Sequence, residues 1–406
     1  FSSVDAGANW SQIGKWWDWT GLNCSVVHAD QHAICFKPGS STTVIFGNDG
    51  GVFYSSNIAS SATSKNIVSR NKNYNVTQFY SAAIHPTAGN HYHLAGAQDN
   101  GTQQFNSASS NSTLQVYGGD GGYCFIDQVN PNYQVVSYVN NNFFLYYPDG
   151  NGDTTMMDLI ASDNTGSFIN PACYDNNRHV LYTYKSSDPT TGGSIYRVKN
   201  ITSAPNILLD SLNVTNLTSE VTAFKVSPYT TSSTTLFIGT ASGKLIKLAN
   251  ANGSSPTETD ITGTLPTGSI SCIEFGSTEN QLLVTFFNYG LASKIYYSSN
   301  GGTTWVSKMG DFPDMPVRWA LFNPNHVSTE VILATELGVY GTTNFNNTTP
   351  TWTARNTGFS NVRTDMLQMR TSDKMVIAAT FGRGLYSSMG FSESTPTITS
   401  FTPTSA

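Results

Sequence analysis

The sequence predicts an all-β protein, a single eight-bladed β-propeller of four-stranded antiparallel blades, and two observations support it. A phrase of about 47 residues recurs roughly eight times, which is the length typical of a propeller blade. Segments rich in Val, Ile, Phe, Tyr and Thr, bounded by Gly, Asn, Ser and Pro, indicate strands, and no convincing helical period is present. Seven blades are the alternative.

Each copy is clearest at its middle turn, where a glycine-marked turn is followed by a short apolar strand. The clear copies begin at Gly47 (GNDGGVFYS), Gly96 (GAQDNGTQQF), Gly239 (GTASGKLIKL), Ala334 (ATELGVYGTT) and Ala379 (ATFGRGLYSS), and weaker versions lie near Val139, Thr183 and Thr285. The spacing between these turns stays between about 43 and 56 residues. An upstream strand ends near proline in several copies, as in HAICFKP, SAAIHP, TAFKVSP and WALFNP.

The two ends of the chain are expected to complete one blade together. Residues 3–19 supply one turn and one outer strand, whereas residues 363–388 supply three strands. Pairing the N-terminal strand with the last blade would close the ring and remove exposed sheet edges. This predicts a propeller over residues 1–390, although Phe1 beginning inside a severed earlier blade is the alternative.

Residues 391–406 are expected to form a Ser/Thr/Pro-rich linker. The final residues, ITSFTPTSA, resemble the opening strand of an immunoglobulin-like TIG module, so additional domains are expected in the same parent chain.

Composition indicates an extracellular or cell-surface location. Only 11% of the residues are charged, so neutral polar side chains provide the solubility, as in many secreted β-proteins. The net charge of −6 gives no basic surface for nucleic acid, and no apolar run is long enough for a transmembrane segment.

The five cysteines are too few and too scattered for a disulfide framework. Cys35, Cys124, Cys173 and Cys272 lie on upstream strands, which favours small buried side chains. A Cys24–Cys35 bridge is the one attractive pairing, and the sequence leaves it open.

Two short motifs carry a family resemblance. Ser3–Trp10 (SVDAGANW) matches the Asp-box pattern Ser-x-Asp-x-Gly-x-x-Trp, and Ser298–Trp305 (SSNGGTTW) matches it with Asn300 in the Asp position. The chain therefore resembles the Asp-box, or BNR, β-propellers, which include sialidases, xyloglucanases and sortilin (VPS10)-type receptors. The phrases HADQHA, GNDGGVFYS, QDNGTQ, GGDGG and ATFGRGLY resemble secreted bacterial sortilin-like propellers, frequently cargo of type IX secretion. The Asp-box itself is expected to be a structural turn between the third and fourth strands.

Candidate functional residues gather on the loops expected at one face of the propeller. The inter-strand turns carry Asp49, Asp99 and Asn100. The connections that lead into the first strand of a blade carry His28, Asp30 and His32 for the first blade and Asp120 for the third. The functional interpretation is a ligand pocket with Trp319 or Tyr123 stacking on a sugar or peptide, and the alternative is turn-shaping side chains. His28, Asp30 and His32, which share one strand face, are also candidate metal ligands with Asp49.

Arg318, Arg363 and Arg383 are expected opposite these acidic residues on the same face. Arginine clusters grip substrate carboxylates in sialidases, but the Arg-Ile-Pro phrase of that family is absent, and sialidase activity is not expected. Asp49, Asp99 and Asp120 are candidate catalytic carboxylates for a glycoside hydrolase, which needs two flanking carboxyl groups.

A separate calcium candidate is DGNGDTTMMD, where Asp149, Asn151 and Asp153 follow the one-three-five spacing of oxygen ligands and Asp158 is an imperfect closing carboxylate. A plain hairpin turn is the alternative. No cofactor is expected beyond this possible structural calcium ion.

The predicted function is a binding, adhesive or scaffold module for a glycan or protein partner, with glycoside hydrolysis as the alternative.

Overall fold

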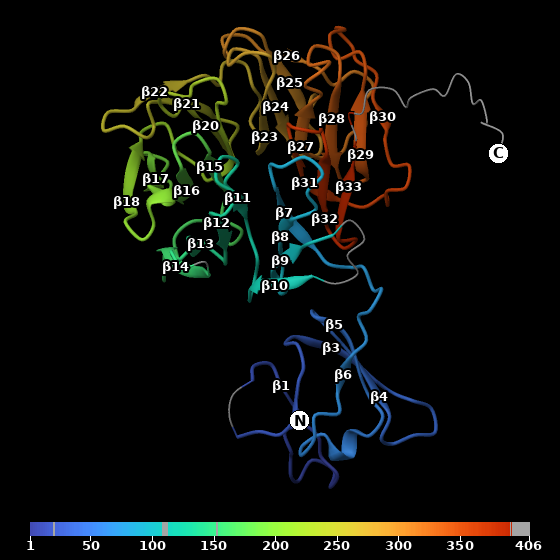
Figure 1. Cartoon of the computed structure of the whole chain (residues 1–406). Coiled ribbons are helices and arrows are strands. Elements are labelled where there is room, and N and C mark those ends of the chain that lie inside the picture. The colour runs from blue at the N-terminus through green and yellow to red at the C-terminus, as the bar shows by residue number, and fades with distance from the viewer. Residues whose placement is uncertain (19–20, 108–112, 152, 390, 392–406) are drawn as a thin grey trace, which may run out of the picture. The chain divides into compact units, whose positions relative to one another are not determined.

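The computed structural model describes residues 1–18, 21–107, 113–151, 153–389 and 391. These residues are almost entirely β-strands and turns, and their strands form nine sheets, most of which are four-stranded and antiparallel (Figure 1). The chain divides into two compact units, residues 77–108 with 114–406 and residues 1–76 with 109–113. Each unit is described by itself.

The larger unit contains seven sheets in which strands consecutive in sequence are neighbours. The first is formed by β7 (Phe79–Ile84), β8 (His93–Ala97), β9 (Gly101–Phe105) and β10 (Leu114–Tyr117). The second is formed by β11 (Phe125–Ile126), β12 (Gln134–Ser137), β13 (Phe143–Pro148) and β14 (Thr154–Ile160). The third is formed by β15 (Ala172–Asp175), β16 (Val180–Ser186), β17 (Gly193–Lys199) and β18 (Leu208–Val214), with the 3₁₀ turn η2 (Ile201–Ser203) between its last two strands. The fourth is formed by β19 (Val221–Val226), β20 (Leu236–Thr240), β21 (Leu245–Ala249) and β22 (Thr257–Asp260).

Three further sheets complete this unit. The fifth is formed by β23 (Ile270–Phe275), β24 (Leu282–Phe286), β25 (Ile295–Ser298) and β26 (Val306–Ser307). The sixth is formed by β27 (Val317–Phe322), β28 (Val331–Thr335), β29 (Gly338–Thr342) and β30 (Thr353–Ala354). The seventh has three strands, β31 (Thr364–Met369), β32 (Val376–Thr380) and β33 (Leu385–Ser388).

The first strands of the sheets pack side by side. From β15 the contacts run through β19, β23, β27 and β31 to β7, which also contacts β11. Figure 1 shows β31 beside β7, so the seventh sheet lies against the first. Apolar side chains fill the space between them, with Phe79 and Ala82 of the first sheet in one cluster with Met366 and Ile377 of the seventh. The prediction of an all-β chain of four-stranded, propeller-like sheets is confirmed.

A buried arginine links the first and seventh sheets. Arg370, only 1% exposed, donates from Nη1 to the carbonyl oxygens of His85 at 3.2 Å and Asn90 at 2.6 Å. Asp373 accepts from Arg370 Nε at 2.8 Å and also from the Gly89 amide at 2.9 Å. Five groups from both sheets are thus joined in one network.

The N-terminal strand and the seventh sheet belong to different units, so the expected pairing of that strand with the last blade stays a prediction. The seventh sheet keeps three strands, and the N-terminal strand β1 (Gly14–Lys15) pairs with β2 (Ser25–Val26) in the smaller unit. Backbone bonds join the first and seventh sheets, because the amides of Gly382 and Gly384 donate to the Thr77 carbonyl oxygen. The expected linker over residues 391–406 lies, apart from Phe391, outside the described residues.

The smaller unit contains one four-stranded sheet built like those of the larger unit. It consists of β3 (Gln31–Phe36), β4 (Val44–Asn48), β5 (Gly51–Ser55) and β6 (Val68–Ser69), with the 3₁₀ turn η1 (Ile58–Ser60) between β5 and β6. Gly51 at its middle turn has a φ of +108°, and Asn71 caps the turn by accepting from the Val52 amide at 2.7 Å. The sixth sheet repeats this arrangement with Gly338, at a φ of +90°, and Asn356.

The two sequences that resemble Asp-boxes form turns with the same hydrogen bonds. At Ser298 the Oγ accepts from the Gly302 amide at 2.9 Å, and Asn300 Oδ1 accepts from the Thr304 amide at 2.9 Å. The first sequence repeats both bonds, because Ser3 Oγ accepts from the Gly7 amide at 2.8 Å and Asp5 Oδ1 accepts from the Asn9 amide at 2.9 Å. In both turns, side-chain oxygens bond the backbone locally.

Candidate binding site

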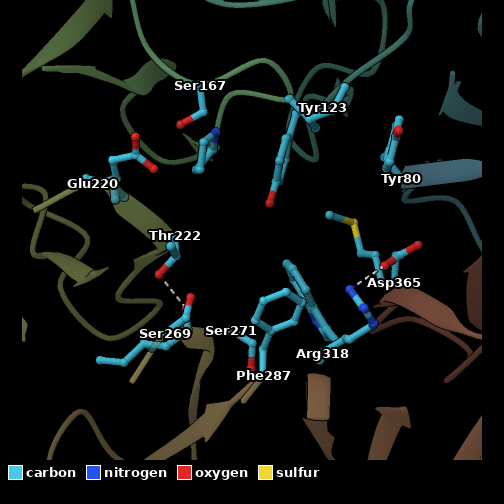
Figure 2. Close-up of a pocket in the computed structure, with 16 residues that line it drawn as sticks. Tyr80, Tyr123, Ser167, Glu220, Thr222, Ser269, Ser271, Phe287, Arg318 and Asp365 are labelled. Atoms are coloured by element: carbon cyan, nitrogen blue, oxygen red, sulfur yellow. Dashed lines mark hydrogen bonds and ion pairs between the residues drawn. The ribbon is translucent and has the colours of Figure 1, made fainter. Parts of the chain in front are cut away.

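A pocket of about 300 Å³ opens where the first strands of the larger unit begin (Figure 2). Its lining comes from segments far apart in sequence, including Tyr80 in β7, Thr222 in β19 and Asp365 in β31. Because all lining residues belong to the larger unit, the packing of its first strands alone positions the pocket.

A repeated β-bulge supplies one pocket residue from each of five sheets. In each, the register between first and second strands shifts across a single residue, and that residue lines the pocket. The five residues are Tyr80, Thr222, Ser271, Arg318 and Asp365. A bulge leaves one residue outside the regular ladder and re-aims its side chain, which places these five around a common centre.

Arg318 organises one wall of the pocket. Its Nε donates to Glu336 Oε1 at 2.8 Å, and its Nη1 donates to Asp365 Oδ1 at 3.0 Å. Its Cζ lies 4.8 Å from the centre of the Phe287 ring, a cation–π distance. Arg363 also donates to Asp365 Oδ1, from Nε at 2.9 Å. The guanidinium of Arg318 is therefore already paired with two carboxylates.

Two buried polar atoms at the pocket have no hydrogen-bond partner among the residues that the structure describes. They are Asp365 Oδ2 and the indole Nε1 of Trp319. The Asp365 side chain is 9% exposed, and burial raises its pKa, although Arg318 and Arg363 act in the opposite direction. Buried polar atoms are normally hydrogen-bonded, so each such atom calls for an explanation. Both residues line the pocket, but these two atoms themselves have almost no exposed surface.

The rest of the lining combines aromatic rings with hydroxyl groups. Figure 2 shows the Tyr123 hydroxyl pointing into the pocket, with Phe287 on the opposite wall and Glu220 at one side. Ser271 donates to the Val317 carbonyl oxygen at 2.6 Å, so neighbouring sheets brace the lining. This mixture can pack on the apolar face of a small molecule while hydrogen-bonding its polar edge.

Asp99, Asn100 and Asp120, predicted as ligand-binding residues, lie together near Tyr80. The Asp99 amide donates to Asp120 Oδ1 at 2.9 Å, and Asn100 Nδ2 donates to the Gln98 carbonyl oxygen at 3.0 Å. Burial is the main cause that raises the pKa of Tyr80, and the charges of Asp120 and Asp99 add to it. These residues are not in the lining of the pocket, but their turn contacts it because Tyr80 donates to Gln98 Oε1 at 2.6 Å.

The predicted arginines have different surroundings. Arg318 and Arg363 both contact Asp365, and Arg363 lies 4.3 Å from the centre of the Phe381 ring. Arg383 is exposed and does not line the pocket. Trp319, predicted to stack on a ligand, does line it.

The other predicted residues lie in the smaller unit. His32 occupies the bulge of the β3–β4 pair, and its Nε2 lies 2.5 Å from Asp49 Oδ1. The His32 side chain is 68% exposed. His28 Nδ1 lies 3.3 Å from the Ala29 carbonyl oxygen, and Asp30 is exposed with a φ of +56°.

The calcium candidate forms the turn between β13 and β14. Asp149 Oδ1 accepts from the amides of Asn151 at 2.8 Å and Asp153 at 3.2 Å, and these bonds lower the pKa of Asp149. Asp158 is paired with Phe144 further along β14. The carboxylates of Asp149, Asp153 and Asp158 do not lie together as a three-ligand group within 4.8 Å. Residue 152, inside this turn, lies outside the described residues.

The cysteines are thiols in this structure. Cys24 is buried and Cys35 exposed, and both are free. Cys124, Cys173 and Cys272 are buried as predicted, and burial raises the pKa of each thiol, to about 12 for Cys124 and Cys272. Such thiols pack as small apolar groups.

Sequence reasoning identified Arg318, Trp319 and Tyr123 but missed Asp365, Glu220 and several hydroxyl residues that line the pocket.

The chain matches no protein-family profile and no curated protein sequence. Within the described residues, no helix is both long and apolar enough to cross a membrane.

Proposed function

We propose that the larger unit is a seven-bladed propeller that binds a glycan in its central pocket, as a module of an extracellular or cell-surface protein. The blade count rests on its seven sheets and on the contacts that run from sheet to sheet back to β7. The location rests on the low content of charged residues. A protein ligand at the same pocket is an outcome that the experiment below distinguishes.

One observation carries the proposal. The pocket lining combines the aromatic rings of Tyr123, Phe287 and Trp319 with hydroxyl groups and with the carboxyl groups of Glu220 and Asp365. Polar groups of this kind are costly to desolvate unless a ligand forms hydrogen bonds with them. Sugars offer many hydroxyl groups on one edge and an apolar C–H face that packs on aromatic rings, so their chemistry matches this lining.

A glycan array with the purified chain tests this proposal. Wild-type protein is expected to retain a group of related glycans, and Tyr123→Phe is expected to weaken that binding by about tenfold, since it removes a hydroxyl group that points into the pocket. Tyr289→Phe is the matched control, because Tyr289 is 64% exposed and does not line the pocket. Retention of no glycan, or equal losses in both variants, would reject the proposal; capture of proteins alone would favour a protein ligand.

Glycoside hydrolysis is the second candidate function. Glu220 and Asp365 lie on opposite sides of the pocket in Figure 2, and a glycoside hydrolase needs two carboxyl groups flanking the scissile bond. Release of reducing ends by wild type, abolished in Glu220→Gln while binding persists, would establish hydrolysis. Binding without any release would leave a lectin-like module.

A further inference from the structure

We infer that the pocket binds the end of a glycan chain or branch and not a segment from the middle of a chain. This inference rests on the proposed glycan binding and names the part of the glycan that enters. Two observations carry it. Side chains contributed by all seven sheets, or by the connections that lead into them, surround the pocket, and packed residues close its inner end.

The first observation is that the pocket has side chains on every side. Five sheets supply the bulge residues described above, and the connections that lead into the second and third sheets supply Tyr123 and Ile169. In Figure 2, Tyr123 lies opposite Phe287. Glu220 and Asp365 lie on the two remaining sides. A segment from the middle of a chain must leave its binding site in two directions, and side chains stand in both.

The second observation is that the inner end of the pocket is closed. A second cavity of only about 10 Å³ lies next to the pocket, and the two share Tyr123, Ser271 and Trp319. Residues further along the first strands complete its lining, among them Ala223 and Cys272, which are 6% and 2% exposed. A cavity of this size holds about one water molecule. A glycan that enters the pocket therefore cannot continue along the first strands beyond it.

The size and polarity of the pocket also favour a chain end. Its volume of about 300 Å³ lies at the lower limit of small-molecule pockets, so a chain bent back on itself does not fit. The end unit of a glycan carries a free hydroxyl group where a middle unit carries a glycosidic bond. The Tyr123 hydroxyl points into the pocket, and Tyr123 also lines the inner cavity, so this hydroxyl is placed to bond the unit that enters first.

Titration calorimetry with chains of increasing length tests the inference. The probes are linear oligosaccharides of glucose, xylose, mannose and galactose, from disaccharide to hexasaccharide, with the corresponding soluble polysaccharides and the same series of any other sugar that the array retains. We expect one protein molecule to bind each linear chain, whatever its length, because a chain has one end of each kind. The affinity per chain should change by less than about twofold beyond the trisaccharide.

The Ser269→Trp variant gives a second readout, because Ser269 lines the pocket and a large ring there occupies the space of the chain end. This variant should bind every chain at least about tenfold more weakly. Ser277→Trp is the matched control, because Ser277 is exposed and does not line the pocket. Circular dichroism and the melting temperature show whether Ser269→Trp folds. If it does not fold, the stoichiometry of the wild type still decides.

Two results would overturn the inference and leave glycan binding in place. They are an affinity that rises steadily with chain length and several protein molecules bound along one polysaccharide chain. Unchanged binding by a folded Ser269→Trp variant would place the glycan outside the pocket and overturn both proposals. Binding of no probe here and of no glycan on the array would reject the proposed function together with the inference.

Discussion

At the scale of single residues, stability depends on charges that are buried with one partner. Arg370 is 1% exposed, whereas Asp373, its partner, is 20% exposed. Asp373→Asn therefore leaves a buried guanidinium without its carboxylate partner, and we expect a loss of about 3–5 kcal/mol in the free energy of unfolding. Urea denaturation measures this loss. Asp260→Asn is the control. Its partner Lys244 is 33% exposed, Asp260 itself is 38% exposed, and their charged atoms are 4.0 Å apart. Such a surface pair contributes little, so this variant should change the free energy of unfolding by less than about 1 kcal/mol.

The same pair has a predictable response to acid. Arg370 holds the pKa of Asp373 well below its ordinary value of 3.8. Since the folded-state pKa is depressed, the stabilisation is present above pH 3.8 and is lost as the pH falls further. The difference in stability between wild type and Asp373→Asn should therefore shrink below that pH, and an unchanged difference would contradict the ion pair.

His93 gives a response in a higher pH range. It is 5% exposed at the start of β8, and burial, followed by the charge of Arg370, lowers its pKa from 6.5 to about 4. The neutral form is favoured on folding, so stability is fully present above pH 6.5 and decreases as the pH falls toward 4. Between these two pH values, His93 should change the free energy of unfolding of the wild type by up to about 3 kcal/mol. His93→Val should remove this change, so its melting temperature should vary less with pH. His326→Val, at an exposed histidine, is the control.

At the scale of elements, the middle turns depend on glycine. Gly338 has a φ of +90°, and a Cβ there would lie 2.5 Å from Asn356 Oδ1. Asn356 cannot move freely, because it bonds the Val339 amide and the Leu337 carbonyl oxygen. Gly338→Ala should therefore cost about 2–4 kcal/mol of stability. Gly358→Ala shares the positive φ but meets no atom within 4 Å, so it should cost about 1 kcal/mol. Equal costs would show that Asn356 is not a fixed cap.

The sheet of the smaller unit differs from the others in the exposure of its first strand. All six residues of β3 are exposed, and Ile34, Phe36 and Ile45 are 59%, 47% and 49% exposed. In the fifth sheet Ile273 and Phe275 hold the positions of Ile34 and Phe36, relative to the bulge, and are buried. Exposed apolar surface of this kind promotes association and dye binding. Changing Ile34, Phe36 and Ile45 to Thr should reduce the fluorescence of a hydrophobic dye without lowering the melting temperature of the larger unit. Unchanged fluorescence would show that this face is covered in solution.

The bulges show which part of the site could be predicted from sequence. Strand segments, turn glycines and the approximate repeat follow from local patterns, because periodicity and turn chemistry are written in neighbouring residues. A bulge is a register shift between two strands, so Thr222 and Asp365 look like ordinary strand residues until the pairing is known. Trp319 was identifiable as an unusual residue beside Arg318, but its unpartnered nitrogen depends on tertiary packing.

At the scale of the whole molecule, the last sheet of the larger unit lies against its first sheet. The expected closure rested on the three strands of the last repeat and on one spare strand at the other end of the chain. The structure makes the junction through Arg370, the Thr77 carbonyl oxygen and an isolated pairing of Gln78 with Phe381. Sequence patterns could not show this, because side-chain bonds between residues about 280 positions apart leave no local periodicity.

The central claim is that a glycan occupies the pocket of the larger unit. The indole N–H resonance of Trp319, which lines this pocket, tests the claim most directly, in a ¹H–¹⁵N spectrum recorded while the glycan that binds best on the array is added and assigned with Trp319→Phe. Trp305 and Trp352 are internal references, because their Nε1 atoms already donate to the carbonyl oxygens of Ile261 and Lys308. We predict a saturable shift of the Trp319 resonance while both references remain in place. Saturable sugar binding with an unmoved Trp319 resonance would contradict the account.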